Sequence, residues 1–188
     1  MAKVLAVLGS PRRNGNSACL AEQVMSGARS LGATTETVYL HELEIKPCDA
    51  CDLCEGDTYT GCVIDDDMQM LYPKIIEADA IVIASPIYWF TVSAQTKLFI
   101  DRGYALKSKD GYVLKGKRMG IVLSYEDSDP VTSGAVNAIR TFQDISAYVK
   151  ATITGFVYGR AAGPGEIAKN AGLMEEAFEL GKKLVGES

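Results

Sequence analysis

Four of the chain's five cysteines lie within fifteen residues, in the stretch CDACDLCEGDTYTGC. They are Cys48, Cys51, Cys54 and Cys62. Thiols gathered in this way can form disulfides, bind zinc, act as a redox relay or hold an iron–sulfur cluster. Three cysteines separated by two residues each place their thiolates around one small loop, which is how many [4Fe–4S] sites begin.

Composition and compartment help to choose among these chemistries. Near the N-terminus the sequence reads KVLAVLG, an apolar run too short for the core of a signal peptide, so we expect a cytoplasmic location. Thiols stay reduced there, which disfavours disulfides. Structural zinc more often uses two separated pairs or adds histidine, and the one histidine, His41, lies seven residues before Cys48. We therefore expect the four cysteines to hold a [4Fe–4S] cluster, with zinc or free thiols as alternatives, and Cys19 to be buried packing.

A second polar group, GSPRRNGNS (Gly9–Ser17), joins an apolar run to a helical pattern. A helix N-terminus offers free amides and partial positive charge, and both suit a phosphate. The sequence lacks the Gly-x-Gly-x-x-Gly spacing of dinucleotide sites and the Gly-Lys-Ser/Thr ending of triphosphate loops. A hydroxyl-rich loop without lysine fits one terminal monophosphate, and a capped turn is the alternative. The candidate binding residues are Ser10, Arg12, Asn14, Asn16 and Ser17.

Three adjacent aromatic residues follow a later apolar run, in SPIYWFTVSAQ (Ser85–Gln95). A planar aromatic ligand would use ring faces and backbone amides at such a place, whereas packing of a helix onto a sheet is the alternative. The candidate residues are Pro86, Ile87, Tyr88, Trp89 and Phe90. Combined with a loop that suits one phosphate, this segment predicts flavin mononucleotide (FMN).

Apolar runs alternate with helical periodicity along the chain. The predicted strands are Lys3–Gly9, Thr35–Leu40, Ala80–Ser85, Arg118–Ser124 and Thr152–Gly159. The predicted helices are Asn16–Leu31, a helix from DDDM to about Ala78, Ser93–Leu106, Ser133–Val149 and Glu166–Val185. On the third helix we expect Leu98 and Ile100 to face inward, and we interpret Asp65–Asp67 as caps of the second.

This alternation predicts an α/β fold, a three-layer α/β/α sandwich with a five-stranded parallel sheet. Five strands favour the flavodoxin-like order 2-1-3-4-5, in which ligands bind at the carboxyl ends of the strands. No linker or repeat divides the chain, so we expect one FMN-binding domain over residues 1–188 with a cysteine-rich insertion at 46–64.

The segments GSPRRNGNS and SPIYWFTVSAQTKLFIDR resemble the flavin-phosphate and flavin-ring segments of the NAD(P)H-dependent FMN reductase superfamily. The cysteine spacing is similar to that of its iron–sulfur flavoproteins, which carry a compact four-cysteine motif after the second strand. The resemblance implies FMN and a [4Fe–4S] cluster as cofactors, and a homodimer or homotetramer. It also implies that SYEDSDPVTSG forms a third wall of the flavin site through Ser124 and Tyr125. The cysteine segment leaves the edge of the sheet that the flavin loops share, so we expect it near the flavin of its own chain or of a partner.

These features predict an FMN-dependent oxidoreductase that passes electrons from a donor such as NAD(P)H or ferredoxin to a small-molecule or protein acceptor. The net charge of −5 argues against nucleic acid as a partner, and no apolar run reaches the ~18 residues of a membrane span. The alternatives are an NAD(P)H:quinone or flavin reductase with structural cysteines, and a non-enzymatic electron carrier. Because the chemistry belongs to the cofactors, we expect no catalytic side chain.

Overall fold

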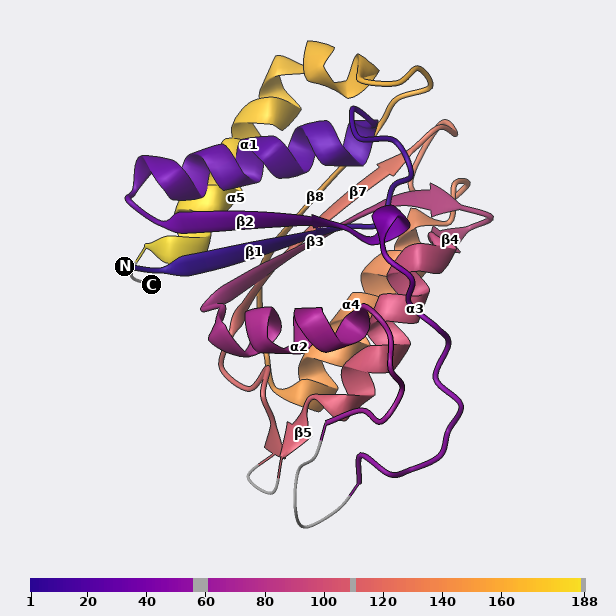
Figure 1. Ribbon diagram of the computed structural model, residues 1–188. Helices are drawn as coiled ribbons and strands as arrows, with labels where there is room; N and C mark the ends of the chain where they lie inside the picture. Colours follow the sequence, from indigo (N-terminus) through magenta and orange to yellow (C-terminus); the bar gives the residue numbers. More distant parts are fainter. Residues whose placement is uncertain (56–60, 109–110, 187–188) are drawn as a thin grey trace.

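The structure is a computed structural model that describes residues 1–55, 61–108 and 111–186. Its centre is a twisted parallel sheet with helices on both faces (Figure 1). The five parallel strands are β1 (Lys3–Leu8), β2 (Thr34–Tyr39), β3 (Ala80–Tyr88), β7 (Arg118–Tyr125) and β8 (Thr152–Arg160). Their order is β2-β1-β3-β7-β8, which is 2-1-3-4-5 when these five are counted alone. The predicted fold class and strand order are confirmed.

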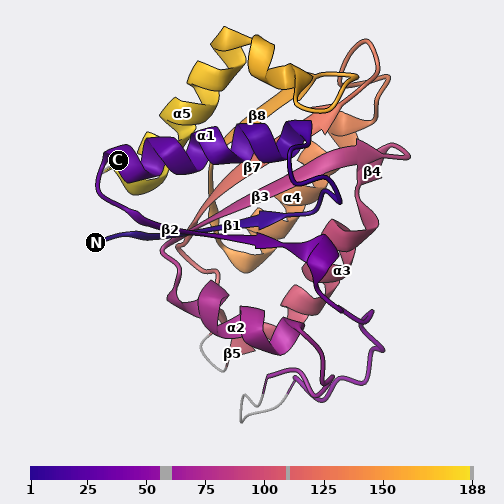
Figure 2. The same cartoon turned by 45° about the horizontal axis from the view of Figure 1, so that its top comes forward.

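The helices divide between the two faces of the sheet (Figures 1 and 2). The first layer consists of α1 (Asn16–Ser30) and α5 (Ala171–Val185). The second layer consists of α2 (Met68–Glu77), α3 (Ala94–Arg102) and α4 (Ala135–Val149). Successive side chains of β1 point to opposite faces of the sheet. Val4 and Ala6 pack in the core under α1 and α5, whereas Leu5 and Val7 pack in the core under α2, α3 and α4.

Shorter elements complete the chain. They are the strands β4 (Thr91–Val92), β5 (Lys107–Ser108) and β6 (Gly111–Tyr112), and the 3-10 helices η1 (Leu40–Glu42), η2 (Gly103–Ala105) and η3 (Glu166–Lys169). Strand β4 pairs antiparallel with the end of β3, so the two form a hairpin at the carboxyl edge of the sheet. No helix within the described ranges combines the length and the apolar character that crossing a bilayer requires.

Helices α1 and α5 meet backbone to backbone. A Cβ atom at Gly181 would lie 1.8 Å from the carbonyl oxygen of Val24, and one at Gly27 would lie 1.9 Å from that of Phe178. No side chain larger than hydrogen fits either position. The close contact fixes α1 against α5 and the sheet, and so fixes the loop that leads into α1.

The structure differs from the sequence predictions at several element ends. Strand β3 continues beyond Ser85 to Tyr88, and the predicted closing helix is split into η3 and α5. The predicted third helix ends at Arg102, before η2. Its fully buried side chains are those of Thr96, Phe99 and Arg102. Of the two residues predicted to face inward, Ile100 is half-buried and packs against the core, whereas Leu98 is half-buried at the edge of that face. The sequence pattern gave no reason to place an arginine inside.

Candidate cofactor sites

The loop before α1 has the properties of an anion site. The amides in the first turn of a helix have no acceptor within that helix. The side chain of Ser17 lies in this turn and is 1% exposed, and its Oγ has no hydrogen-bond partner among the described residues. Ser10 is also buried, and its Oγ accepts from the amide of Arg12 at 3.1 Å. A buried hydroxyl without a partner costs about 1–3 kcal/mol. A bound phosphate oxygen would remove this cost by accepting a hydrogen bond from Oγ of Ser17.

The charged and amide side chains of this loop have different surroundings. Arg12 and Asn14 are exposed at the rim of the loop. Arg13 pairs with Glu42 at 2.6 Å, and its guanidinium lies 4.5 Å above the ring of Tyr39. Because the guanidinium of Arg13 already interacts with Glu42 and Tyr39, Arg12 is the arginine of this loop that is better placed to bind an anion.

Asn16 ties the loop to the chain after β8. Its Nδ2 donates to the carbonyl oxygens of Ala161 at 3.3 Å and Gly163 at 3.0 Å, and its Oδ1 accepts from the amide of Ile167 at 3.2 Å. The side-chain amide predicted as a phosphate donor thus braces the backbone, and the backbone amide of Asn16 is the group that the helix end offers to a ligand.

The predicted aromatic segment is the tip of the β3–β4 hairpin. Tyr88 pairs with Thr91, and the two residues between them, Trp89 and Phe90, have φ angles of 49° and 68°. Hairpin turns of this kind normally use Asn or Gly, because left-handed backbone costs other residues about 1–2 kcal/mol each. Asn137 of α4 holds the turn by donating to the carbonyl oxygen of Phe90 at 3.0 Å. The side chain of Trp89 is 92% exposed, so the turn presents an aromatic ring to the outside.

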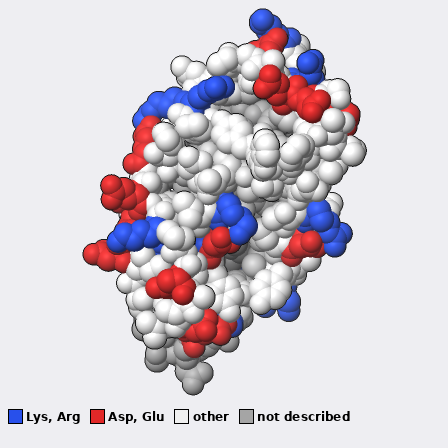
Figure 3. Space-filling model, turned by 90° about the vertical axis from the view of Figure 1, so that its right-hand side faces the viewer, with Lys and Arg blue, Asp and Glu red and all other residues white. Residues whose placement is uncertain are grey.

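A hollow of about 500 Å³ lies between this hairpin, the loop after β7 and the end of β8. Its lining includes Ile87, Trp89, Phe90, Tyr125, Asp127 and Arg160. Pro86, at the entrance to the hairpin, is opposite Ser124 in the register of β3 and β7, so these two predicted segments are adjacent. Figure 3 shows this face, where a broad uncharged area lies between charged groups above and below it. Asp127 lies in the SYEDSDPVTSG segment that the sequence analysis placed at this wall, although it was not named there as a candidate residue. Arg160, the last residue of β8, was missed because no motif marks the end of that strand.

The loop after β7 is shaped by one carboxylate. The Oδ2 atom of Asp129 accepts from the hydroxyls of Thr132 at 2.6 Å and Ser128 at 3.0 Å, and its Oδ1 accepts from the amide of Val131 at 2.8 Å. These hydrogen bonds, chiefly those from Thr132, lower the pKa of Asp129 to about 2. Burial raises the pKa of Tyr125 at the start of the same loop. The loop therefore has a defined conformation beside the hollow.

Ser93 joins the phosphate loop to the hairpin, a role that the sequence did not indicate. Its Oγ donates to the carbonyl oxygen of Gly9 at 2.7 Å, and its amide donates to Oγ of Ser85 at 3.0 Å. The same Oγ accepts from the amide of Thr96 and so begins α3. The two candidate flavin loops are thus held in one hydrogen-bonded unit.

The four clustered cysteines line a single hollow of about 240 Å³. Cys48 and Cys51 are exposed, Cys54 and Cys62 are half-buried, and none of the four forms a disulfide. Burial raises the pKa of Cys54, and the neighbouring thiols add to this effect. Within the described part of the chain, no three His, Cys, Asp or Glu side chains converge on a position for a single metal ion.

The donor set of this hollow suits an anionic metal centre. Four thiols are the ligand set of a [4Fe–4S] cluster, which carries net negative charge when thiolates bind it. Arg102, 1% exposed, lines the same hollow, and its Nε has no hydrogen-bond partner among the described residues. Asp66 was interpreted as a helix cap and does accept from the amide of Met68 at 3.0 Å, but its main partner is Arg102.

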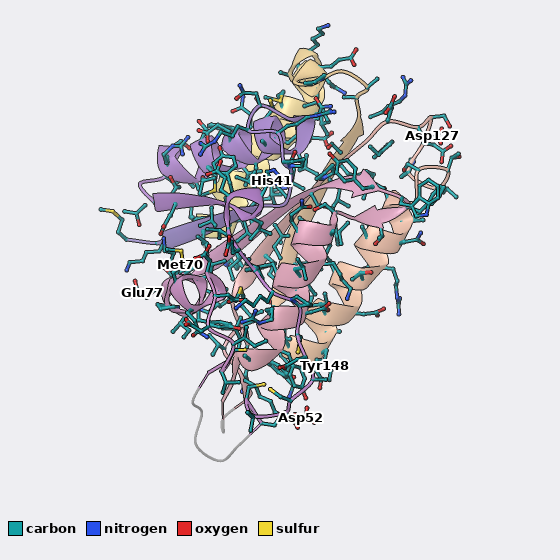
Figure 4. All side chains as sticks on the ribbon, turned by 45° about the vertical axis from the view of Figure 1, so that its right-hand side comes forward. His41, Asp52, Met70, Glu77, Asp127 and Tyr148 are labelled. Atoms are coloured by element: carbon teal, nitrogen blue, oxygen red, sulfur yellow. The ribbon has the colours of Figure 1, made fainter. Side chains whose placement is uncertain are left out.

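The cysteine hollow does not lie beside the candidate flavin loops of the same chain. The segment leaves β2 at the carboxyl edge and then runs along the helical layer to the far end of α3 (Figures 1 and 2). The nine residues of α3 span about 14 Å at about 1.5 Å each. Figure 4 shows Asp52 of the cysteine hollow and Asp127 of the carboxyl edge at opposite ends of this layer. Of the two predicted placements, the one beside the flavin of the same chain is not supported.

The one histidine and the fifth cysteine, His41 and Cys19, lie apart from the clustered cysteines. His41 is exposed, with its Nδ1 atom 3.4 Å from Nε2 of Gln95. Cys19 is half-buried and packs against the core beneath α1 and α5. Neither lies in the cysteine hollow.

Comparison with known proteins gives consistent matches. A family model described as NADPH-dependent FMN reductase matches residues 2–155, a range that contains the loop before α1, the four clustered cysteines, the aromatic hairpin and the loop after β7. An iron–sulfur flavoprotein of Methanocaldococcus jannaschii is 31% identical over 189 aligned positions, covering 97% of this chain and 95% of that protein. An iron–sulfur flavoprotein of Methanosarcina thermophila is 37% identical over 122 positions, which cover 65% of this chain and 62% of that protein.

A solved structure extends the match to the whole fold. The NAD(P)H:quinone oxidoreductase from Methanothermobacter marburgensis superposes with a TM-score of 0.75 at 17% identity, covering 100% of this chain and 98% of that one. At this identity the superposition shows the fold alone.

Proposed function

The chain belongs to the NADPH-dependent FMN reductase family and, within it, to the iron–sulfur flavoproteins, and from this membership we propose that it passes electrons from a nicotinamide donor to an acceptor by means of FMN and a [4Fe–4S] cluster. Family membership makes it an FMN-dependent oxidoreductase. The observation that supports the proposal of a cluster is that all four clustered cysteines line one hollow, together with a buried arginine. When bound, FMN exchanges two electrons and a cluster exchanges one at a time.

Two sets of residues would hold FMN. Ser10, Ser17 and the first-turn amides of α1 would bind its phosphate, with Arg12 and Asn14 at the rim. The ring would lie against the aromatic hairpin, with Ser124 and Tyr125 at the wall formed by β7. The unpaired hydroxyl of Ser17 and the strained turn at the hairpin tip support this assignment, because strained backbone concentrates at ligand sites.

We further propose that residues 1–188 form one FMN-binding domain in which residues 46–64 are an insertion that carries the cluster. Residues 56–60 of that insertion lie outside the described ranges. Cys48, Cys51, Cys54 and Cys62 would each bind one iron.

The separation of the two sites bears on assembly. Because about 14 Å of helix α3 lies between the hairpin and the cysteine hollow, we propose that the cluster meets the flavin of a partner chain in a homodimer or homotetramer. The exposed ring of Trp89 supports such an arrangement, since exposed aromatic side chains are frequent at subunit interfaces.

The test is anaerobic stopped-flow reduction with NADPH, with the flavin and cluster absorption bands followed separately and a quinone then added as acceptor. Both bands should bleach and recover together in the native protein. Cys54→Ala should abolish the cluster band and slow the recovery of the flavin band, whereas Cys19→Ala should change neither. Equal recovery of the flavin with and without the cluster would instead indicate a quinone reductase with structural cysteines.

A further inference from the structure

The side chain of Arg102 is buried to an extent that is unusual for a charged residue. It ends helix α3 and is 1% exposed, and its carboxylate partner Asp66 is equally buried. The pair is bidentate, with Nη1 donating to Oδ2 and Nη2 donating to Oδ1 at 3.1 Å. The carbonyl oxygen of Arg102 accepts from the hydroxyl of Tyr72 at 3.1 Å, which fixes the end of the helix.

This ion pair closes the base of the cysteine segment. Nη1 of Arg102 donates to the carbonyl oxygen of Lys46 at 2.9 Å, and Oδ2 of Asp66 accepts from the amide of Lys46 at 2.9 Å. Lys46 precedes the first clustered cysteine and Asp66 follows the last. One guanidinium therefore binds both ends of the segment, although the residues between them form no helix or strand within the described part of the chain.

The same guanidinium also contacts one of the clustered thiols, that of Cys62. Its Nη2 donates to Sγ of Cys62 at 3.4 Å, and the side chain lines the hollow that the four cysteines share. Among the described residues that line this hollow, Arg102 is the sole cation, whereas Asp49, Asp52 and Asp101 are acidic. Asp101 is paired with Lys97 at 2.7 Å on the surface of α3. The Nε atom of Arg102 remains as a buried donor without a partner among the described residues.

We propose that Arg102 is a positioning residue for the metal centre, which holds Cys62 toward the hollow and raises the reduction potential of the bound cluster. This inference rests on the proposed cluster. Reduction adds one electron to a group that is already anionic, so a cation and an N–H···S hydrogen bond favour the reduced state. Asp66 opposes this effect by partly neutralising the guanidinium, so the pair as a whole sets the potential.

The opposing signs of the two charges give the test. We would measure the cluster's midpoint potential by anaerobic redox titration with detection by electron paramagnetic resonance. Arg102→Gln/Asp66→Asn removes both charges together, which avoids a buried unpaired charge. It should make reduction at least tenfold less favourable, which is a shift of at least about 59 mV to lower potential for a one-electron couple. Asp66→Asn alone should shift the potential upward, because it leaves the guanidinium uncompensated.

Arg118→Gln is the matched control. Arg118 also donates to backbone carbonyl oxygens, those of Leu184 at 3.1 Å and Gly186 at 2.7 Å, but it lies away from the cysteines. This variant should leave the cluster potential unchanged, and none of the variants should alter the FMN content. The double variant decides the outcome if Asp66→Asn does not fold.

The possible results are distinguishable. A double variant with full iron content and the native midpoint would overturn the role of Arg102. A folded double variant that retains FMN but loses iron would support the positioning of Cys62. Native protein that contains no iron would refute the cluster itself, and with it the proposed function, before any variant is compared.

Discussion

Replacing Ser17 with alanine should change protein stability and flavin affinity in opposite directions. The hydroxyl of Ser17 is buried in the first turn of α1 and has no partner among the described residues. In the flavin-free protein this group is a desolvation cost, so Ser17→Ala should raise the free energy of unfolding by about 1 kcal/mol. For a domain of this size, such a change raises the melting temperature by about 2–4 °C.

The effect on FMN should be a loss of affinity. A hydrogen bond to a charged group is worth about 1.5–3 kcal/mol, so without the hydroxyl the dissociation constant should rise about 10- to 100-fold. Thermal melts of the flavin-free protein and fluorescence titration with FMN measure the two quantities. Ser17→Asp, which places a carboxylate beside the phosphate, should weaken FMN further by repulsion.

Ser146→Ala is the matched control. Ser146 is a buried serine in α4 whose Oγ donates to the carbonyl oxygen of Ala151 at 2.9 Å. Its replacement should lower stability by about 1 kcal/mol and leave FMN affinity unchanged. The reasoning is refuted if Ser17→Ala behaves like Ser146→Ala, with reduced stability and native affinity for FMN.

Three further predictions concern the scaffold. Gly134 has φ +79°, and a Cβ there would lie 2.5 Å from Cα of Phe90. Gly134→Ala should therefore distort the hairpin tip and weaken FMN binding in the fluorescence titration. Native affinity for FMN in this variant would show that the tip does not contact the flavin. Gly181→Ala should force α1 and α5 apart, since its Cβ would lie 1.8 Å from the carbonyl oxygen of Val24, and urea denaturation should show a loss of at least about 1–3 kcal/mol. Asp129 has its pKa lowered to about 2, chiefly by Thr132, so the unfolded state binds its proton first as pH falls. Its contribution to stability should therefore be present above about pH 4 and lost toward pH 2, and Asp129→Asn should remove this part of the pH dependence in denaturation curves at pH 2–5.

The sequence predicted the sheet because five apolar runs alternate with helical periodicity, and such alternation permits few topologies. The sequence also predicted a loop before the first helix, which the structure contains, and its use as a phosphate site stays a prediction that follows from its position at a helix N-terminus. The candidate ligand set of four cysteines was equally visible, since the spacing of four thiols within a short segment needs no tertiary information.

The course of the cysteine segment was not predictable in the same way. Between η1 and α2 the described residues form no regular element, so no periodicity indicates where the segment leads. Its course depends on the ion pair of Arg102 and Asp66, which are 36 positions apart. In sequence, the arginine resembles a solvated residue at a helix end and the aspartate resembles a cap, and only their contact in the fold makes both buried.

The hairpin was missed for a local reason. Strand β3 extends past its apolar run, and the turn at Trp89 and Phe90 lacks the Gly or Asn that normally indicates a hairpin. Contacts from α4 hold this turn in place, so its conformation follows from packing and could not be recognised from turn residues.

The most direct test of the account is the metal and flavin content of protein purified without oxygen. The account predicts about four irons with matching acid-labile sulfide for each chain, together with one FMN, and loss of the iron in Cys48→Ala, Cys51→Ala, Cys54→Ala and Cys62→Ala but not in Cys19→Ala. About one zinc for each chain with no iron, or FMN-loaded protein with neither metal, would contradict it.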